Sequence, residues 1–209
     1  MSVDIPAPSL RERILSAAFA AFMEQGYAGT STLDIATRAK VSKRDLYAQF
    51  GSKQAMLSAC IGERAARMRV PLNLAAPHDR ASLVGMLTRF GATLVLEVSR
   101  PEVLAVYRLA IQEAERAPDV ARTLDELGRA NTLTALSRLV AASQAANLIG
   151  AGKPEEIADR FTALLWGTNR LVRLLLRVTD PPDAAEAEHL ASAATSALLK
   201  LYPPPATQP

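Results

Sequence analysis

The chain contains very little cysteine or histidine. Its 209 residues include one cysteine, Cys60, and two histidines, His78 and His189. A single cysteine excludes an intramolecular disulfide and any zinc cluster built from cysteines, and it suits a reducing compartment. Neither histidine has metal-ligand or catalytic-triad spacing around it, so surface or packing roles are favoured. We therefore expect a cytoplasmic protein with no metal and no cofactor.

Recognisable enzyme and membrane signatures are also lacking. The glycine-containing segment at residues 150–153 has neither the spacing nor the Ser/Thr of a phosphate-binding loop, and is better interpreted as an interhelical connection. The first nine residues lack the basic start and apolar stretch of a secretory signal. The longest apolar stretch, Leu164 to Leu176, is interrupted by Arg170 and Arg173. These observations predict a protein that is not an enzyme and has no membrane partner.

Apolar residues, in contrast, are abundant and recur at helical spacing. They make up 49% of the chain, which is enough to bury a sizeable core. Helical stripes fall on residues 10–22, 83–94, 104–111, 124–136, 157–175 and 190–201. No segment has the alternation of a strand, so we expect an all-α fold of about nine helices. The net charge is only +3, and positive charge therefore matters where it is concentrated.

Two helix-start signals lie close together between Thr30 and Lys53. Ser31 is followed three residues later by Asp34, and Ser42 by Asp45, so each pair can form a capping box. The signals predict short helices over residues 32–39 and 43–49, joined by a tight turn. This arrangement is a helix-turn-helix. Its two helices would be locked together by the apolar residues Ile35, Ala36, Ala39, Val41, Leu46 and Phe50.

The same segment is basic. From Thr37 to Lys53, Asp45 alone opposes five positive side chains, namely Arg38, Lys40, Lys43, Arg44 and Lys53. A basic run alone is more often a solvated face, but the capping signals and the tight turn favour DNA binding. In a helix-turn-helix the second helix enters the major groove by its N-terminal end, so Lys43 or Arg44 can donate to guanine. Gln49 can pair with adenine or with a phosphate. Ser31, Thr32 and Lys53, at helix N-termini, suit phosphate contacts.

These residues resemble the TetR/AcrR family of bacterial transcriptional regulators over roughly the first 57 residues. The resemblance is carried by Gly26-Tyr27, Thr30-Ser31, Ile35-Ala36, Val41-Ser42, Leu46-Tyr47, Phe50, Ser52-Lys53 and Met56-Leu57. Residues 100–122 are also similar to the C-terminal domain of AefR-like members. The resemblance implies a homodimer that binds a palindromic double-stranded DNA operator, usually represses, and is released by a small molecule. The residues themselves leave repression and activation equally open.

The resemblance also implies roles for individual residues. The family's groove-facing positions fall on Lys43, Arg44, Tyr47 and Gln49, and its phosphate contacts on Ser31, Thr32, Tyr47 and Lys53. The chain departs from the family pattern at Lys40, where glycine is usual and where a left-handed backbone costs ~1 kcal/mol. It also has Arg44 and Asp45 where glycine and threonine are common. Arg44 is therefore expected to contribute a base preference particular to this chain.

The predicted domains are a disordered N-terminus (1–8), a helix-turn-helix DNA-binding domain (9–52), a ligand-binding and dimerisation domain (53–202) and a disordered tail (203–209). Dimerisation is assigned to the last two long helices, residues 157–176 and 184–201, because small residues permit close helix approach. Those residues are Ala184, Ala185, Ala187, Ala191, Ala193, Ala194 and Ala197. The alternative is that the last helix is an internal core helix.

A ligand cavity in the second domain is implied by the resemblance. Large or adaptable side chains with a few polar groups would suit a hydrophobic or amphipathic effector. The candidate lining residues are Met68, Met86, Phe90, Tyr107, Asn131 and Trp166, each of which can equally be plain core. The competing hypothesis for function is a helical small-molecule carrier, or an enzyme, that retains a vestigial DNA-binding domain.

Overall fold

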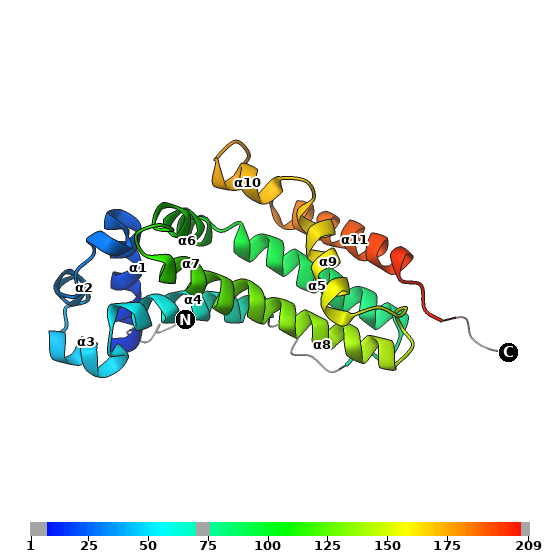
Figure 1. The fold of residues 1–209 in the computed structure, drawn as a ribbon, viewed down its shortest axis with the longest axis horizontal. Coiled ribbons are helices and arrows are strands. Elements are labelled where there is room, and N and C mark those ends of the chain that lie inside the picture. Colours follow the sequence, from blue (N-terminus) through cyan, green and yellow to red (C-terminus); the bar gives the residue numbers. More distant parts are fainter. Residues whose placement is uncertain (1–7, 70–75, 206–209) are drawn as a thin grey trace, which may run out of the picture. The chain divides into compact units, whose positions relative to one another are not determined.

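The structure, a computed structural model, describes residues 8–69 and 76–205 and is helical throughout these ranges, with no strand (Figure 1). Its helices are α1 (Leu10–Gly29), α2 (Thr32–Ala39), α3 (Lys43–Phe50), α4 (Lys53–Arg69), α5 (Arg80–Val98), α6 (Pro101–Gln112), α7 (Pro118–Leu124), a π-helix (Asp125–Ala130), α8 (Asn131–Ala145), α9 (Pro154–Trp166), α10 (Arg170–Leu175) and α11 (Ala184–Leu201). The all-α prediction is confirmed. The predicted disordered ends fall mainly on residues 1–7 and 206–209, which lie outside the described residues.

The chain divides into two compact units. Unit 1 comprises Met1–Glu63 and Ala105–Asp125, and unit 2 comprises Arg64–Leu104 and Glu126–Pro209. Each boundary near the middle of the chain falls inside a helix, so α4 and α6 both run from one unit into the other. The expected functional boundary between residues 52 and 53 stays a prediction.

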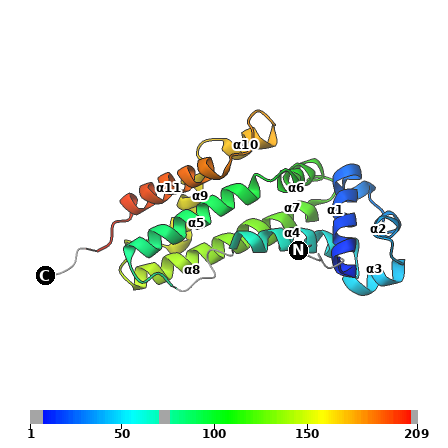
Figure 2. The ribbon, with the colours of Figure 1, turned by 180° about the vertical axis from the view of Figure 1, so that it is seen from behind.

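Unit 1 is organised around α1, with α2 and α3 beside it (Figure 2). Ser9 begins α1 with a complete capping box to Glu12. The helix buries one apolar face made of Ile14, Leu15, Ala18, Ala21 and Phe22. Its regular geometry is interrupted at Gly26, where φ is +76°, in the left-handed region that favours glycine. Gly26 therefore marks a kink inside α1.

The capping signals of α2 and α3 have different outcomes. At α3, Ser42 and Asp45 form the complete reciprocal box that the sequence predicts. At α2, Ser31 Oγ accepts from the Asp34 amide at 3.1 Å, but the prediction that the Asp34 carboxylate reaches back is wrong. That carboxylate instead accepts from Arg38 Nε at 3.1 Å and from Gln25 Nε2 at 3.0 Å. Arg38, one turn further along α2, and Gln25, from α1, therefore bind the Asp34 carboxylate in place of the local cap.

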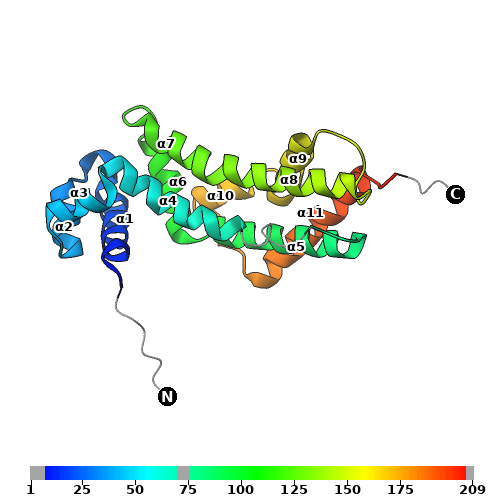
Figure 3. The ribbon, with the colours of Figure 1, turned by 90° about the horizontal axis from the view of Figure 1, so that it is seen from below.

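Unit 2 is built on the pairing of α5 with α11, and α9 contacts both (Figure 1). Helices α5 and α11 approach each other closely at Gly91, where an added Cβ would lie 2.9 Å from the Ala191 Cβ. Beside it, the rings of Phe90 and Phe161 lie 6.1 Å apart between centroids. The helix α8 packs along α9 on another side (Figure 3). This apolar core explains why α5 is so hydrophobic.

Helix α5 is the single described helix long and apolar enough to cross a membrane by length and composition. Its apolar face is occupied within the protein, because eight of its residues are buried, among them Leu87, Phe90 and Val95. A buried core helix meets the same criteria as a spanning helix. The packing against α11 accounts for its composition without a membrane.

Two expected single helices are divided in the structure. The stripe expected over residues 124–136 contains the end of α7, a π-helical turn at Asp125–Ala130 and the start of α8. The long helix expected over residues 157–175 is broken after Trp166, where Gly167 adopts a φ of +56°. Glycine tolerates this conformation without a steric cost, so the chain turns and restarts as the short helix α10. An apolar stripe alone does not reveal such a break.

The last helix, α11, has its alanines on two different faces. Ala187, Ala191 and Ala194 are buried in the subunit's own core, where α11 meets α5. Ala184, Ala185 and Ala193 are exposed. The expectation that all these alanines offer a partner surface is therefore wrong for the three buried ones. Three of the seven alanines thus serve packing within the chain, three are exposed, and Ala197 is half-buried.

Candidate nucleic-acid interface

The turn between α2 and α3 has a left-handed residue at its start. Lys40 has φ of 54° and ψ of 51°, as expected from its replacement of the usual glycine. Its amide donates to Thr37 O at 3.2 Å, and the Val41 amide donates to Ala36 O at 3.0 Å. These bonds satisfy carbonyls at the end of α2 and hold the turn tight. The geometry required of a helix-turn-helix is thus present with a lysine at this position.

One face of α3 is exposed and carries four of the predicted contact residues. Leu46 is fully buried, which fixes the rotation of the helix. Lys43, Arg44, Tyr47 and Gln49 are all exposed, and Tyr47 retains 46% of its accessible surface despite being aromatic. The Tyr47 hydroxyl lies 3.2 Å from Thr32 Oγ1, so the structure brings these two residues together. A hydroxyl pair beside two cations suits a phosphate and a base edge.

The basic face is narrower than the sequence indicates, because Arg38 is paired within unit 1. Its guanidinium lies 2.6 Å from Glu24 Oε2 and 3.0 Å from Asp34 Oδ2. The hydrogen bond to Glu24, and to a smaller extent the one to Asp34, raise the pKa of the Arg38 guanidinium. Lys40, Lys43 and Arg44 remain exposed around the turn and the start of α3. The positive charge is therefore concentrated at the N-terminal end of the second helix.

Lys53 occupies an internal position that the sequence did not suggest. Its ammonium donates to Tyr27 O at 2.8 Å and to Thr30 O at 2.9 Å, and it lies 4.5 Å from the centroid of the Tyr27 ring. Burial lowers the pKa of Lys53, and the Glu113 carboxylate opposes that shift. The ammonium has three donors, so one remains for a phosphate. The phosphate role stays a prediction, while the structural role is visible.

Sequence reasoning missed Glu113, which lies far from the helix-turn-helix in the chain. Its Oε1 accepts from the Ala28 amide at 3.3 Å and would lie 2.9 Å from a Cβ added at Gly26. Its Oε2 is buried and has no hydrogen-bond partner among the described residues. The carboxylate thus packs against the point where α1 changes direction. No local signal reveals this, because the contact joins residues 85 positions apart.

A second long-range link within unit 1 runs through Gln54. Its Oε1 accepts from the Tyr27 hydroxyl at 2.8 Å, and its Nε2 donates to Thr123 Oγ1 at 2.9 Å. Burial raises the pKa of Tyr27, and the nearby Asp119 carboxylate adds to that shift. Together with Glu113, this bridge ties residues 105–125 to the C-terminal end of α1 and to the start of α4. The helix α1 is therefore held by a segment that lies outside the predicted 9–52 domain.

The six predicted ligand-lining residues do not come together around one cavity of the described structure. Met86 and Phe90 lie on the buried face of α5, whereas Asn131 is exposed at the start of α8. Tyr107 belongs to unit 1, and the Met68 side chain lies outside the described residues. A cavity of about 420 Å³ is lined by Trp166 together with residues of α10 and α11, including Arg173 and Leu190. Of the six candidates, that cavity includes Trp166 alone.

Comparison with known families and structures agrees with this arrangement. The family of bacterial regulatory proteins described as the tetR family matches residues 14–60, and the AefR-like transcriptional repressor C-terminal domain matches residues 85–204. A TetR transcriptional regulator from Agrobacterium tumefaciens is 26% identical, with a TM-score of 0.76 over 93% of this chain and 95% of that one. The flavonoid-responsive regulator FrrA is 27% identical, with a TM-score of 0.75 over 95% and 98% of the two chains. Curated protein sequences provide no significant match.

The two matched regions account for the two functional parts of the chain. The first contains the capped α2–turn–α3 element with its exposed Lys43, Arg44 and Tyr47. The second extends over more than half of the chain and contains the α5, α8, α9 and α11 core. The structural relatives named above are transcriptional regulators. The chain belongs to the tetR family of DNA-binding transcriptional regulators, with a C-terminal domain of the AefR-like type.

Proposed function

We propose that this protein is a ligand-responsive repressor that binds a palindromic operator as a homodimer in the cytoplasm. A small hydrophobic or amphipathic effector releases it from the DNA. Residues 9–52 read the operator, and residues 53–202 bind the effector and form the dimer. The observation that carries this proposal is the capped α3, which holds Lys43, Arg44 and Tyr47 on an exposed face beside Thr32.

The side chains of α3 divide between base reading and phosphate binding. Lys43 and Arg44 donate to base edges from the N-terminal end of α3, which is the end that enters the major groove. Gln49 reads adenine or binds a phosphate. Tyr47 and Thr32 share a phosphate through their paired hydroxyls, and the Ser31 and Lys53 positions flank it. A symmetric dimer then binds two half-sites in successive major grooves, ~34 Å apart.

A gel shift with the DNA upstream of the protein's own gene tests this assignment. The double variant Lys43→Ala/Arg44→Ala should lose specific binding, because each lost base contact costs ~1–3 kcal/mol. Arg89→Ala/Arg116→Ala is the matched control, since both arginines are exposed and neither belongs to the helix-turn-helix. Unchanged sequence preference in the α3 variant would refute the assignment. Loss of binding in the control would show that net charge alone matters.

The exposed faces of α9 and α11 support the dimer. Leu164 on α9 retains 38% exposure, and Ala163 beside it is exposed. On α11, Ala185 and Ala193 face away from α5. Small and apolar residues on two neighbouring helices permit the close helix approach of a four-helix interface.

The effector class is supported by two observations. FrrA, one of the structural relatives, is named as responsive to flavonoids, which are aromatic and amphipathic compounds. Trp166, the chain's single tryptophan, lines the cavity next to α10 together with Thr168 and Thr179. Aromatic packing with a few polar groups suits such a ligand. A shift in unit 2 is transmitted through α4 and α6, because both helices continue into unit 1.

Titration with representative flavonoids tests the effector proposal, with Trp166 fluorescence as the readout. Effector binding should change the fluorescence and weaken operator affinity, and operator DNA should lower effector affinity by the same factor. The alternative of a carrier with a vestigial reader predicts ligand binding without any operator binding. An effector that binds free and DNA-bound protein equally well would contradict the repressor proposal.

A further inference from the structure

An arm, defined here as residues 170–178 and containing α10, has an apolar surface that its own subunit does not cover. Val172 is 51% exposed, Leu176 is 67% exposed and Val178 is 59% exposed. In Figures 1 and 2 the arm lies at the edge of unit 2, on the side away from α8. Single exposed apolar residues are ordinary, but three within seven positions of one short segment form a patch. Such a patch indicates contact with another surface.

The arm is also basic, and its arginines differ in their surroundings. Arg170 Nη1 donates to Glu186 Oε1 at 2.7 Å, which attaches the start of the arm to α11. Arg173 and Arg177 are exposed, and neither has an ion pair within the described residues. Arg177 has φ of +57°, a conformation that glycine adopts more readily. The arm therefore presents two uncompensated cations beside its apolar patch.

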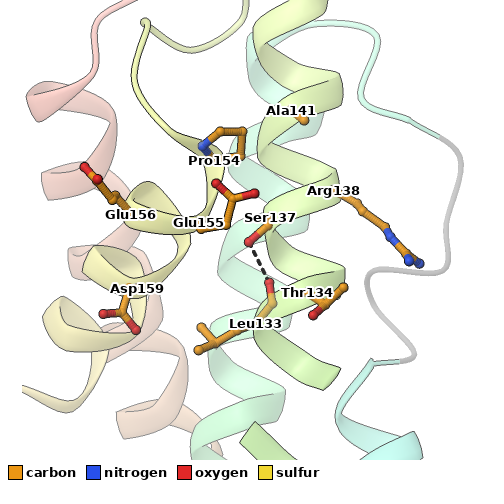
Figure 4. A pocket seen from close by; sticks show the side chains of 9 residues that line it. All are labelled: Leu133, Thr134, Ser137, Arg138, Ala141, Pro154, Glu155, Glu156 and Asp159. Carbon is orange, nitrogen blue, oxygen red and sulfur yellow. Dashed lines mark hydrogen bonds between the residues drawn. The ribbon is translucent and has the colours of Figure 1, made fainter. Parts of the chain in front are cut away.

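A groove of complementary character lies between α8 and α9. Its volume is about 560 Å³, and its lining includes Leu133, Arg138 and Ala141 from α8 with Glu155, Glu156 and Asp159 from α9, so its three carboxylates outnumber its one arginine. Figure 4 shows Glu155 between the two helices and Asp159 one turn further along α9. Glu156 pairs with Lys153 at 3.0 Å, whereas Glu155 and Asp159 have no ion pair within the described part of the chain. Asp159 lies beyond the first turn, so helix capping does not account for it.

The arm and the groove lie at opposite ends of α9. The groove residues Glu155 and Asp159 belong to the N-terminal half of this helix, and the arm follows its C-terminal end at Gly167. The helix α9 is ~20 Å long, and this length separates the arm of one subunit from the groove of the same subunit. In a two-fold dimer packed through α9 with the symmetry axis perpendicular to this helix, α9 runs antiparallel to its copy. The N-terminal end of one α9 then lies beside the C-terminal end of the other.

We infer that the arm of each subunit docks in the α8–α9 groove of the second copy. This inference rests on the homodimer proposed above and adds a reciprocal contact at each end of α9. Val172 and Leu176 cover the apolar floor formed by Leu133 and Ala141. Arg173 and Arg177 pair with Glu155 and Asp159 of the other copy. Two identical contacts close the dimer, because an isologous interface uses each patch twice.

Charge reversal provides a test with its own internal control. Variant A carries Arg173→Glu and Arg177→Glu in the arm, and variant B carries Glu155→Lys and Asp159→Lys in the groove. Each alone should raise the dimer dissociation constant at least roughly tenfold, because four attractive pairs become repulsive. All four positions are exposed, so folding should be retained. Arg89→Glu/Arg116→Glu, with exposed arginines elsewhere, should leave the dimer unchanged.

Mixing A with B should restore dimerisation, because in the heterodimer both arms face grooves of opposite charge. A chain that carries all four substitutions should form homodimers again. Sedimentation and native mass spectrometry measure these states. Replacement of Val172 and Leu176 by serine should weaken the dimer without altering its charge.

The outcomes separate this inference from the proposed function. A wild-type protein that is monomeric at micromolar concentration would contradict the proposed homodimer itself. Wild-type dimerisation in both A and B would leave the homodimer intact and refute the docking of the arm. Weakening in A and B without rescue in their mixture would also refute it, because the pairing requires complementarity.

Discussion

The helix-turn-helix and the α9–α11 region are both helical pairs, but they depend on different kinds of contact. At α2 and α3 the cap, the turn and the exposed cations come from neighbouring residues, as in the Ser42–Asp45 box. At α9 and α11 the packing comes from distant partners, as in the approach of Gly91 to Ala191. A helix whose ends are set by neighbouring capping residues can be recognised from the sequence. For a helix whose position depends on packing against distant residues, the tertiary structure is needed to show which of its faces are buried.

The largest expected effect compares two adjacent alanines of α11. Ala194 is 2% exposed and faces the subunit core, whereas Ala193 is exposed. Ala194→Arg should destabilise the fold by several kcal/mol, because an unpaired charge is buried. Ala193→Arg should leave the melting temperature nearly unchanged but weaken the dimer. Thermal circular dichroism and sedimentation distinguish the two, and equal effects on stability would remove the distinction between these faces.

Gly91→Ala tests the close α5–α11 contact. The new Cβ would lie 2.9 Å from the Ala191 Cβ and 3.2 Å from a Phe161 ring atom, so the helices must separate. Overpacking of this kind costs about 2 kcal/mol, measured by denaturant unfolding. Gly29→Ala is a control on another helix, because its nearest neighbour would be 3.8 Å away. Little change in Gly91→Ala would show that α5 and α11 adjust easily.

Lys53→Ala separates the structural role of this lysine from its predicted phosphate contact. Removal of the bonds to Tyr27 O and Thr30 O should cost about 1–2 kcal/mol of stability. If Lys53 also binds a phosphate, the slope of log affinity against log salt should fall by about one. Stability and salt dependence are measured on the same variant. A reduced stability with an unchanged slope would leave only the structural role.

Ser42→Ala tests the local contacts of the reading helix. Loss of a complete capping box should destabilise unit 1 by about 1 kcal/mol and weaken operator binding of every sequence alike. Ser31→Ala removes a simpler cap, because Asp34 does not return the bond, and should cost less. Chemical denaturation of the two variants gives the comparison. A larger cost at Ser31 would contradict the difference between the two caps.

The smallest expected effect concerns the pH dependence at the start of α5. Hydrogen bonds from Ser82 lower the pKa of the Asp79 carboxyl below its unfolded value. Such a group contributes stability above its unfolded pKa, roughly 4, and loses it as the pH falls through the folded pKa. Asp79→Asn should therefore flatten the stability profile slightly below pH 4. Unfolding at pH 3 and pH 7 checks this, and an unchanged pH difference would exclude the contribution.

Prediction from the sequence was most accurate where the determinants are local. The bounds of α2 were predicted exactly as residues 32–39, and α3 extends one residue further than expected, to Phe50. The left-handed Lys40 followed from the replaced glycine. The break after Trp166 was missed because the apolar stripe continues through it. An apolar stripe indicates which residues are buried, but one long helix and two shorter helices can bury the same residues.

In the candidate DNA-binding site, too, some features were predictable from local sequence and others depended on tertiary contacts. Arg44 and Tyr47 point away from the buried Leu46 as the helical period requires, and Lys43 and Gln49, three positions on either side of Leu46, are exposed as well. Arg38 was expected in the basic face, but Glu24 and Asp34 compensate it. Asp34 lies four residues before Arg38 in α2, a spacing visible in the sequence, whereas Glu24 lies on α1 and reaches Arg38 only through the tertiary fold. The positive charge counted from the sequence therefore overestimates the positive charge that is available to contact a binding partner.

The sequence by itself determined where helices start, which face of α3 is polar, and which family the chain resembles. These depend on interactions over three or four positions, which are written directly in the residue order. Only the tertiary structure decided that Glu113 packs against Gly26, that Lys53 is held by two carbonyls, and that Ala194 is buried while Ala193 is not. Such contacts join residues far apart in the chain, and their energies depend on distance and burial that no local pattern contains.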